Sequence, residues 1–305
     1  MRFFVTGASG FVGSALSSEL RSRGMDVRSI LRTQQEIDGS TDWRDALQGV
    51  SVVIHLAARV HVMHESAVDP LAEFRKVNVK GTEHLARSAA AAGVKRLVYV
   101  SSIKVNGEET ANGRRYSEED TPSPQDPYGI SKWEAEQALR RVAAETGLEV
   151  VIIRPPLVYG VGVKGNFAQM LSAVSRRIPL PFAAVINQRS LIYVGNLVDA
   201  LIVCATHPAA IGNVYLVSDG EDVSTPELLR RLDDAMGRPT RIFPSPIWLL
   251  SMMGKIAGRR DQLLRLMGSL QIDSHKIRSE LNWKPPYSLQ QGLQKTAEWY
   301  RDTHR

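Results

Sequence analysis

The chain has 305 residues, of which 43% are hydrophobic and 23% charged, and its formal net charge is +6. Length and composition are typical of one large α/β domain or of a large domain with a smaller one. The basic residues are dispersed in runs of no more than two, which argues against a nucleic-acid partner. Cys204 is the only cysteine, so an internal disulfide is excluded. The N-terminus enters a strand pattern at once and no apolar run is long enough to span a bilayer, so we expect a cytoplasmic protein.

The first element is a short buried strand over Arg2–Thr6, followed by a glycine-rich turn and a helix that extends to Arg23. Strand, glycine turn and helix form the context that a dinucleotide-binding fingerprint requires. Glycines let the backbone approach a pyrophosphate, whose charge is stabilised at the helix N-terminus. The spacing is GxxGxxG, and the predicted cofactor-binding residues of this turn are Gly7, Gly10, Phe11, Val12 and Gly13.

The second strand is predicted over Asp26–Leu31. At the end of this strand, NAD enzymes usually carry an acidic residue for the ribose hydroxyls, whereas this chain has Leu31-Arg32-Thr33. An arginine suits a 2′-phosphate, so Arg32 favours NADP(H), with NAD(H) as the alternative. A solvated Arg32, with the cofactor choice made elsewhere, would be the simpler explanation.

Further cofactor contacts are expected around the third strand, Val52–His55. Asp42 precedes a short helix over Trp43–Gln48 and is assigned to the cofactor site. After the strand come Leu56, Ala57 and Ala58, whose small side chains would let a cofactor lie over the strand ends. The His61-Val-Met-His64-Glu65 segment offers no obvious third ligand, so no metal site is expected.

A possible acid/base pair follows the fourth strand, which is predicted over Arg96–Ser101 after a long helix over Pro70–Ala92. Ser102 comes at the carboxyl end of this strand, where open α/β sheets bind ligands. After a polar loop, Tyr128 and Lys132 are four residues apart at the start of a helical stretch, so both project from one face. We expect the ammonium to lower the pKa of the phenol, which would make Tyr128 an acid/base for a carbonyl/alcohol pair.

Beyond this helix the predicted elements alternate less regularly. They are strands over Glu149–Ile153 and Asn213–Val217, a strand and turn over Arg189–Asn196, and helices over Lys164–Val174 and Leu197–Thr206. Ser224 and Glu227 have the spacing of a capping box, and the chain from Phe243 onward is predicted to be helical. The apolar run Pro246–Ala257 is either the core of a small lobe, a subunit contact or, less favoured, an interfacial membrane anchor.

This pattern predicts an α/β fold: a Rossmann doubly wound parallel sheet with a smaller, mostly helical C-terminal substrate lobe. The expected NAD(P)-binding domain spans residues 1–160, with 188–215 returning to it. Residues 161–187 and 216–305 are expected to form the substrate lobe.

The glycines of the turn, Ser102 and the Tyr128/Lys132 pair together resemble the extended short-chain dehydrogenase/reductases, in the nucleotide-sugar epimerase/dehydratase group. Further matches, which extend the resemblance over nearly the whole chain, are His55-Leu-Ala-Ala58, Asn78-Val-Lys-Gly-Thr82 and Leu281-Asn-Trp-Lys-Pro285. The segments around Ser102 and Tyr128 are most similar to enzymes of bacterial O-antigen clusters. Those enzymes are labelled UDP-glucose 4-epimerase-like, and some of them act as 4-keto-6-deoxy-N-acetylhexosamine reductases in N-acetylquinovosamine synthesis.

The resemblance implies hydride transfer at sugar C4, with Tyr128 giving or taking the proton of the C4 oxygen and Ser102 orienting that oxygen. Lys132 would lower the Tyr128 pKa and hold the nicotinamide ribose, and Pro155 is added to the cofactor set. Lys104, Asn166 and Arg189 are the substrate-binding candidates, with Arg189 as a diphosphate clamp.

Two departures from the family pattern bear on the expected substrate contacts and on the expected reaction. Leu157 replaces a frequent asparagine, for which Asn166 is a candidate substitute. Ile103-Lys104 stands where sugar dehydratases carry Asp-Glu, which disfavours dehydration.

The favoured activity is therefore reduction of a UDP-4-keto-6-deoxy-N-acetylhexosamine, free or lipid-linked, in polysaccharide synthesis. The alternatives are a UDP-glucose or UDP-N-acetylglucosamine 4-epimerase with bound NAD, and a non-catalytic NADP-binding regulatory protein. The expected partner is a nucleotide-sugar substrate, and a homodimer is compatible with the sequence.

Overall fold

The structure is a computed structural model that describes residues 1–30, 37–60, 69–111, 113–237, 242–246 and 266–304. Its centre is a six-stranded parallel sheet with the order β2-β1-β3-β4-β5-β8. The strands are β1 (Arg2–Thr6), β2 (Asp26–Ser29), β3 (Val52–His55), β4 (Arg96–Val100), β5 (Glu149–Arg154) and β8 (Val214–Leu216). The predicted Rossmann sheet is confirmed, and its parallel register brings the carboxyl ends of β1, β3, β4 and β5 to one edge.

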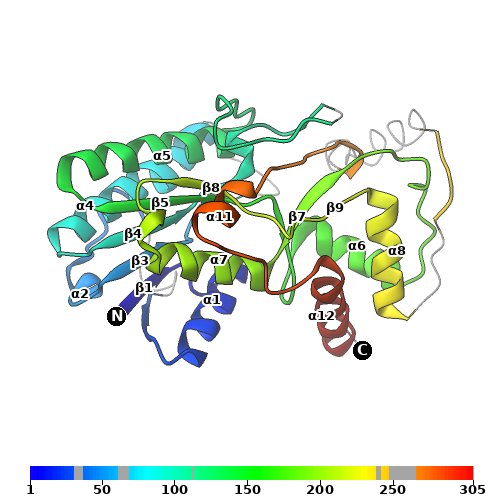
Figure 1. The fold of residues 1–305 in the computed structure, drawn as a ribbon, viewed down its shortest axis with the longest axis horizontal. Helices are drawn as coiled ribbons and strands as arrows, with labels where there is room; N and C mark the ends of the chain where they lie inside the picture. The colour runs from blue at the N-terminus through cyan, green and yellow to red at the C-terminus, as the bar shows by residue number, and fades with distance from the viewer. Residues whose placement is uncertain (31–36, 61–68, 112, 238–241, 247–265, 305) are drawn as a thin grey trace.

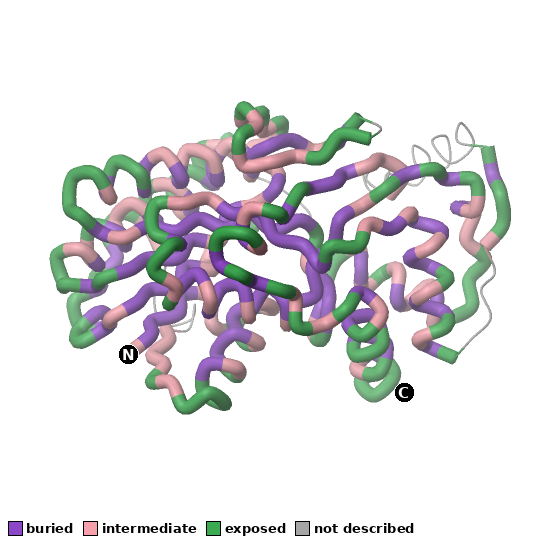
Figure 2. Tube along the Cα trace, viewed as in Figure 1, coloured by how far each residue is buried: buried purple, intermediate pink, exposed green. Residues whose placement is uncertain are grey.

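Helices cover both faces of this sheet (Figure 1). One face carries α1 (Phe11–Ser22) and α7 (Val194–Thr206), whose leucines pack with Phe3 and Val5 of β1. The other carries α2 (Arg44–Leu47), α4 (Thr82–Ala91) and α5 (Pro127–Thr146), which pack with Phe4. The side chains of successive β1 residues therefore pack into opposite cores, because side chains along a strand point alternately to the two faces of the sheet. Burial follows the same layers: the central strands β1, β3, β4 and β5 are mostly buried, whereas the edge strand β2 is exposed or half-buried (Figure 2).

The helix predicted over Pro70–Ala92 is interrupted. It consists of α3 (Pro70–Arg75), a π-helical segment η1 (Lys76–Gly81) and α4. The start agrees with the prediction, since Asp69 caps α3 by accepting a hydrogen bond from the amide of Ala72 at 3.0 Å. The π-helical turn shifts the face that residues 76–81 present to α5, and such turns are frequent at functional sites.

The smaller lobe contains a three-stranded sheet of β6 (Leu157–Tyr159), β7 (Arg189–Tyr193) and β9 (Asp222–Val223). Around it pack α6 (Gly165–Ser175), α8 (Thr225–Met236) and α12 (Leu289–Thr303), which share a second core. Ser224 caps α8 by accepting a hydrogen bond from the Glu227 amide at 3.2 Å, in agreement with its predicted role.

The C-terminal stretch is less helical than predicted. Within its described part, Leu270 and Ile272 form extended bridges to Arg189 and Tyr116, and only a short helix α11 (His275–Glu280) precedes α12. Leu270, Gln271 and Ile272 are all buried, so this extended segment is stabilised by contacts on both of its sides. The candidate anchor over residues 247–257 lies outside the described residues.

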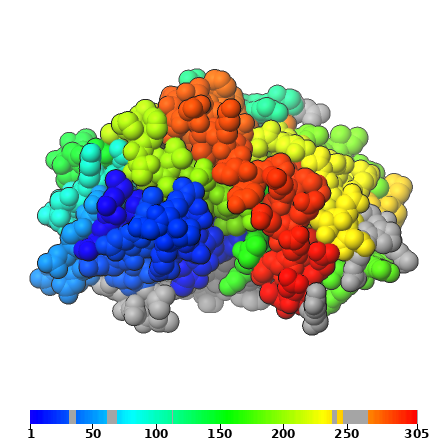
Figure 3. Space-filling view, turned by 60° about the horizontal axis from the view of Figure 1, so that its bottom comes forward, coloured from blue at the N-terminus to red at the C-terminus, as the bar shows by residue number. Residues whose placement is uncertain are grey.

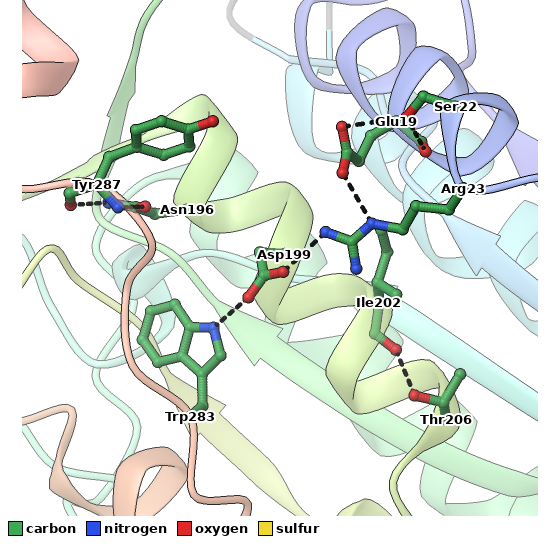
Figure 4. Close-up of polar contacts among 9 residues, drawn as sticks. All are labelled: Glu19, Ser22, Arg23, Asn196, Asp199, Ile202, Thr206, Trp283 and Tyr287. Atoms are coloured by element: carbon green, nitrogen blue, oxygen red, sulfur yellow. Dashed lines mark hydrogen bonds and ion pairs between the residues drawn. The ribbon is translucent and has the colours of Figure 1, made fainter.

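A polar network ties this C-terminal stretch to α7 and α1 (Figure 4). Asp199 of α7 accepts hydrogen bonds from the indole of Trp283 at 3.1 Å and from the guanidinium of Arg23 at 3.0 Å. One turn earlier, the Asn196 side chain donates to the carbonyl of Tyr287 and accepts from its amide. Figure 3 views this side of the molecule, where the C-terminal residues in orange and red share a face with the blue N-terminal region.

Residues 161–187 and 225–236 pack in the smaller lobe, and β8 completes the main sheet. Ile277, Leu281 and Trp283 also pack against the main sheet's core, although they follow the lobe's α8 in sequence. The exact domain boundaries stay a prediction. Among the described residues, no helix combines the length and the apolar composition needed to cross a membrane.

Candidate functional site

The glycine turn between β1 and α1 lies at the carboxyl edge of the main sheet. Gly7 has a positive φ of 70°, and a Cβ on it would come within 2.8 Å of the backbone nitrogen of Ala57. A Cβ on Gly13 would lie 2.0 Å from the carbonyl oxygen of Gly7. Both positions therefore need glycine for close backbone packing, which brings the turn, β3 and α1 together.

Helix α1 begins without a side-chain cap. Its N-cap is Gly10, and Phe11 and Val12 form the first turn. The first amides of a helix have no partner within the helix, so they are oriented to donate hydrogen bonds to an anion. This cradle fits a dinucleotide pyrophosphate, as the sequence predicts for these residues.

The other predicted cofactor residues differ in where they lie. Leu56, Ala57 and Ala58 follow β3 and are partly buried beside the glycine turn, where the Ala57 amide donates to Thr6 Oγ1 at 3.3 Å. Pro155 follows β5, and its carbonyl accepts a hydrogen bond from the amide of Ile103 at 3.0 Å. Their assignments stay predictions.

The structure gives less support to the assignment of Asp42 and Arg32 to the cofactor site. The Asp42 carboxylate is exposed and accepts hydrogen bonds from the Arg44 guanidinium, which together with the Arg44 amide lowers its pKa to about 2. Arg32, on which the preference for NADP(H) depends, lies outside the described residues. Both assignments remain predictions.

Ser102, Tyr128 and Lys132 come together at the same edge. Ser102 follows β4 and accepts a hydrogen bond from the Lys104 amide at 3.2 Å. Tyr128 and Lys132 lie on the first turns of α5, which begins with Pro127 after the cap Asp126. The Ser102 side chain interacts with the Tyr128 hydroxyl and lowers the pKa of the phenol, and the Lys132 ammonium lies 5.8 Å from the centre of the Tyr128 ring. The prediction that Tyr128 and Lys132 share one helix face is thus confirmed.

The expected lowering of the Tyr128 pKa is wrong for the protein without ligands. Burial is the largest cause and raises the pKa above its usual value, because the phenolate would lose its solvation. The charge of Asp126 raises it further, and only the hydrogen bond with Ser102 lowers it. Phe74 of α3 packs edge-on against the Tyr128 ring and contributes to its burial.

Lys132 is buried in a site that favours its neutral form. Its ammonium donates a hydrogen bond to the carbonyl of Val100 at 2.9 Å and lies 4.6 Å from the centre of the Tyr99 ring. Burial lowers the pKa of Lys132 to about 7, an effect that the charge of Glu136 opposes. The side chain can therefore change its charge near neutral pH.

Supporting residues around this cluster were not included among the predicted site residues. The Asn78 side chain donates to Ser131 Oγ at 2.9 Å and bonds both backbone groups of Arg59, so η1 joins the segment after β3 to α5. The match of Asn78-Val-Lys-Gly-Thr82 to the family was the signal that could have identified it.

A buried ion pair lies one helical turn beyond Lys132. Glu136 accepts two hydrogen bonds from the Arg154 guanidinium, at 2.8 and 2.6 Å, and one from Ser101 at 2.6 Å. This pair fixes α5 against the ends of β4 and β5. Its spacing along the chain gave no signal, because the two residues meet only through the fold.

The predicted substrate-binding residues are dispersed around the junction of the two lobes. Lys104 lies in the short 3₁₀ helix η2 (Ile103–Val105), where its ammonium contacts Asp126 and Glu108. Asn166 lies in the first turn of α6, and Leu157 on β6 is exposed. Arg189 begins β7 and donates to the carbonyl of Gly268 at 2.9 Å. Their roles toward a substrate remain predictions.

Within the described ranges, no group of three or more histidine, cysteine, aspartate or glutamate side chains has the arrangement of a metal site. His61, His64 and Glu65 lie outside those ranges.

Comparisons with known proteins agree with this arrangement. The model of the NAD dependent epimerase/dehydratase family matches residues 3–218. A UDP-glucose 4-epimerase of Vibrio cholerae is 45% identical, over 96% of this chain and 94% of the relative. The N-acetyl-alpha-D-glucosaminyl-diphospho-ditrans,octacis-undecaprenol 4-epimerase of Escherichia coli O157:H7 is 29% identical over 96% of this chain and 93% of that protein.

Among solved structures, MoeE5 in complex with UDP-glucose and NAD superposes with a TM-score of 0.79 at 27% identity, covering all of both chains. The fold, the glycine cradle and the extent of these matches agree. The chain therefore belongs to the NAD dependent epimerase/dehydratase family and is an NAD(P)-dependent enzyme.

Proposed function

We propose that the chain interconverts the C4 epimers of a UDP-hexose, UDP-glucose and UDP-galactose in the first instance, with a retained NAD(H). The observation that carries the proposal is the meeting of Ser102, Tyr128 and Lys132 beside the glycine cradle. The 45% identity to the Vibrio cholerae UDP-glucose 4-epimerase supports epimerisation as the reaction performed with this set.

The chain's own residues account for binding and for proton movement. The amides at the start of α1 would hold the pyrophosphate, and the segment Leu56–Ala58 would lie under the dinucleotide. The bound nicotinamide supplies a hydride acceptor and donor for sugar C4. Arg189 and Asn166, near the junction of the lobes, are assigned to the diphosphate and its surroundings.

Tyr128 is assigned as the acid/base at the C4 oxygen. As the base it takes the proton of the C4 hydroxyl, and as the acid it returns a proton to the same oxygen. Ser102, hydrogen-bonded to Tyr128, donates to that oxygen and orients it. Lys132 contributes a positive charge at the Tyr128 ring when it is protonated, and this charge favours the phenolate.

The same three residues would also serve a reductase of UDP-4-keto-6-deoxy-N-acetylhexosamine, free or lipid-linked. The observation in favour of this second candidate, the reductase, is the presence of Arg32 at the position where an arginine would contact the 2′-phosphate of NADP(H). Ile103 and Lys104 supply no carboxylate for dehydration under either proposal.

Two assays on the purified chain separate these activities. The first supplies UDP-galactose without added cofactor, stops the reaction, and only then measures the UDP-glucose formed with a dehydrogenase and its own NAD⁺; we expect conversion. The second supplies UDP-4-keto-6-deoxy-N-acetylglucosamine and NADPH and follows the absorbance of NADPH. Consumption of NADPH without interconversion of the UDP-hexoses would replace the epimerase proposal with the reductase.

A further inference from the structure

An ion pair stands at the start of α5, directly before the acid/base tyrosine. The ammonium of Lys104 donates to one carboxylate oxygen of Asp126 and, at 2.9 Å, to Glu108. The other Asp126 oxygen caps α5 by accepting a hydrogen bond from the Gly129 amide at 2.7 Å. About four-fifths of each side chain in the Lys104–Asp126 pair is buried, so solvent screens this pair less than a surface pair.

We propose that Lys104 is a positioning residue that neutralises the carboxylate of Asp126, and so keeps Tyr128 able to give up its proton. The proposal rests on the assignment of Tyr128 as the acid/base of the proposed function. It gives Lys104 a role through Asp126, in place of the direct substrate contact that the sequence suggested.

The position of Asp126 makes this compensation necessary. Its carboxylate is fixed by the cap two residues before Tyr128, and its negative charge raises the pKa of the buried phenol. A cation bonded to that carboxylate opposes its field at Tyr128, because the fields of two opposite charges at hydrogen-bond distance partly cancel at a third group. Without Lys104, the negative charge of Asp126 would disfavour the phenolate of Tyr128 more strongly.

Other groups around Tyr128 do not replace Lys104. Lys132 approaches the same ring from the next turn of α5, but its burial lowers its pKa to about 7 and weakens its positive charge. Farther along α5, Glu136 is paired with Arg154 and Glu134 with Arg75. From the other packed elements within the described residues, Tyr99 of β4, Phe74 of α3 and Ser102 before η2 interact with Tyr128. Lys104 of η2 and its second partner Glu108 are linked to Tyr128 through Asp126.

The test is a double-mutant cycle on the pH dependence of kcat for UDP-hexose interconversion. Oxidation needs the phenolate, so activity rises with pH through an acidic limb. Lys104→Met should move this limb up by about one pH unit, and Asp126→Asn, which retains a capping oxygen, should move it down by a similar amount. The double variant should return close to the wild-type profile, and Lys104→Arg should preserve it.

Lys95→Met provides the matched control, since Lys95 is exposed and pairs only loosely with Glu149 at the far end of β4. Its profile should be that of the wild type. If Lys104→Met changes KM but leaves the acidic limb of the kcat profile at the wild-type pH, Lys104 contacts the substrate and the inference is overturned. Limb shifts that fail to cancel in the double variant would overturn it as well.

A second readout is independent of turnover. In ligand-free protein with ¹³Cζ-labelled tyrosine, the Tyr128 resonance is identified by its loss in Tyr128→Phe and followed as the pH rises. In Asp126→Asn it should begin to titrate at a lower pH than in the wild type, and in the Lys104→Met/Asp126→Asn double variant it should return close to the wild-type curve, even if no UDP-hexose is converted. In that case the proposed function fails and the inference stands. An Asp126→Asn curve that coincides with the wild type, or one that the added Lys104→Met change leaves in place, would overturn the inference itself.

Discussion

Two clusters of buried polar residues differ in how they use their hydrogen bonds. The α5 cluster consists of Ser102, Tyr128 and Lys132 with His55 and Tyr99. The α7 joint consists of Tyr159, Tyr193, Asn196, Asp199, Asp219, Trp283 and Tyr287. Both contain an ionisable group in the protein interior: Lys132 in the first and Asp219 in the second.

In the α7 joint the polar atoms satisfy one another. Asp219 accepts hydrogen bonds from the Tyr193 amide at 2.9 Å, from Asn196 at 2.7 Å and from the Tyr159 hydroxyl at 2.8 Å. In the α5 cluster, the Lys132 ammonium makes one hydrogen bond to the described part of the chain and otherwise faces two aromatic rings. An ammonium has three donors, so this arrangement leaves capacity for a ligand. The joint connects the two lobes, whereas the α5 cluster is the region that we propose receives another molecule.

The largest expected effect comes from removing the Tyr128 hydroxyl. Tyr128→Phe should lower kcat by about 10²- to 10⁴-fold, since general acid–base catalysis is lost while the buried ring and its contact with Phe74 remain. The measurement is steady-state interconversion of UDP-hexoses, with the melting temperature and the retained cofactor measured on the same preparation. An active variant would remove Tyr128 from the proposed role, and an unfolded one would place the cluster among the residues that maintain the fold.

The second prediction concerns the stability of the α7 joint, from which the central acceptor Asp219 is removed. Asp219→Ala should destabilise the protein by about 3 kcal/mol, because three buried donors lose their acceptor at once. Asp219→Asn retains the shape and one acceptor oxygen and should cost less. Urea denaturation monitored by tryptophan fluorescence measures both variants. Equal stability of Asp219→Ala and the wild type would mean that the joint does not hold the lobes.

The contrast between these regions also explains what the sequence could predict. The β1 strand, the glycine turn and α1 depend on neighbours within about twenty residues, and the spacing of Tyr128 and Lys132 is set by one helix. These features were predicted correctly. The capping of α8 by Ser224 is local in the same sense.

Features that depend on distant contacts were missed. Whether the Tyr128 pKa rises or falls depends on burial, to which Phe74 contributes, and on how its neighbours' charges are compensated. The donors to Asp219 come from β6, β7 and α7, and Glu136 meets Arg154 only when α5 lies on β5. The extended Leu270–Ile272 segment is likewise stabilised by Arg189 and Tyr116, which are far away in the sequence.

His55 allows a prediction about pH within the α5 cluster. It is buried between Thr6 and Thr82, and burial, with the charge of Lys132, lowers its pKa from 6.5 to about 3. The unfolded chain therefore binds a proton that the folded protein excludes between these two values. Stability should fall as the pH drops below about 6.5, by about 2 kcal/mol at pH 5 from this group alone.

Denaturation at several pH values tests this expectation against His55→Gln, which has no proton to gain. The variant will be less stable at every pH, so the informative quantity is the slope of stability against pH. The slope should be shallower in the variant below about pH 6.5. Parallel slopes would assign the acid sensitivity to other groups.

The smallest expected effect concerns the outer side of the α7 joint, where Trp283 and Arg23 share Asp199. Trp283→Phe removes a buried donor and should cost about 1 kcal/mol. Arg23→Met removes an ion pair whose arginine is more than one-third exposed, so solvent screening should reduce its cost below that of Trp283→Phe. Neither residue contacts the α5 cluster, so kcat should stay at the wild-type value in both variants while the melting temperature falls in this order. A loss of kcat without a loss of stability would mean that the joint transmits its geometry to Tyr128, and the division between a connecting region and a reacting region would no longer hold.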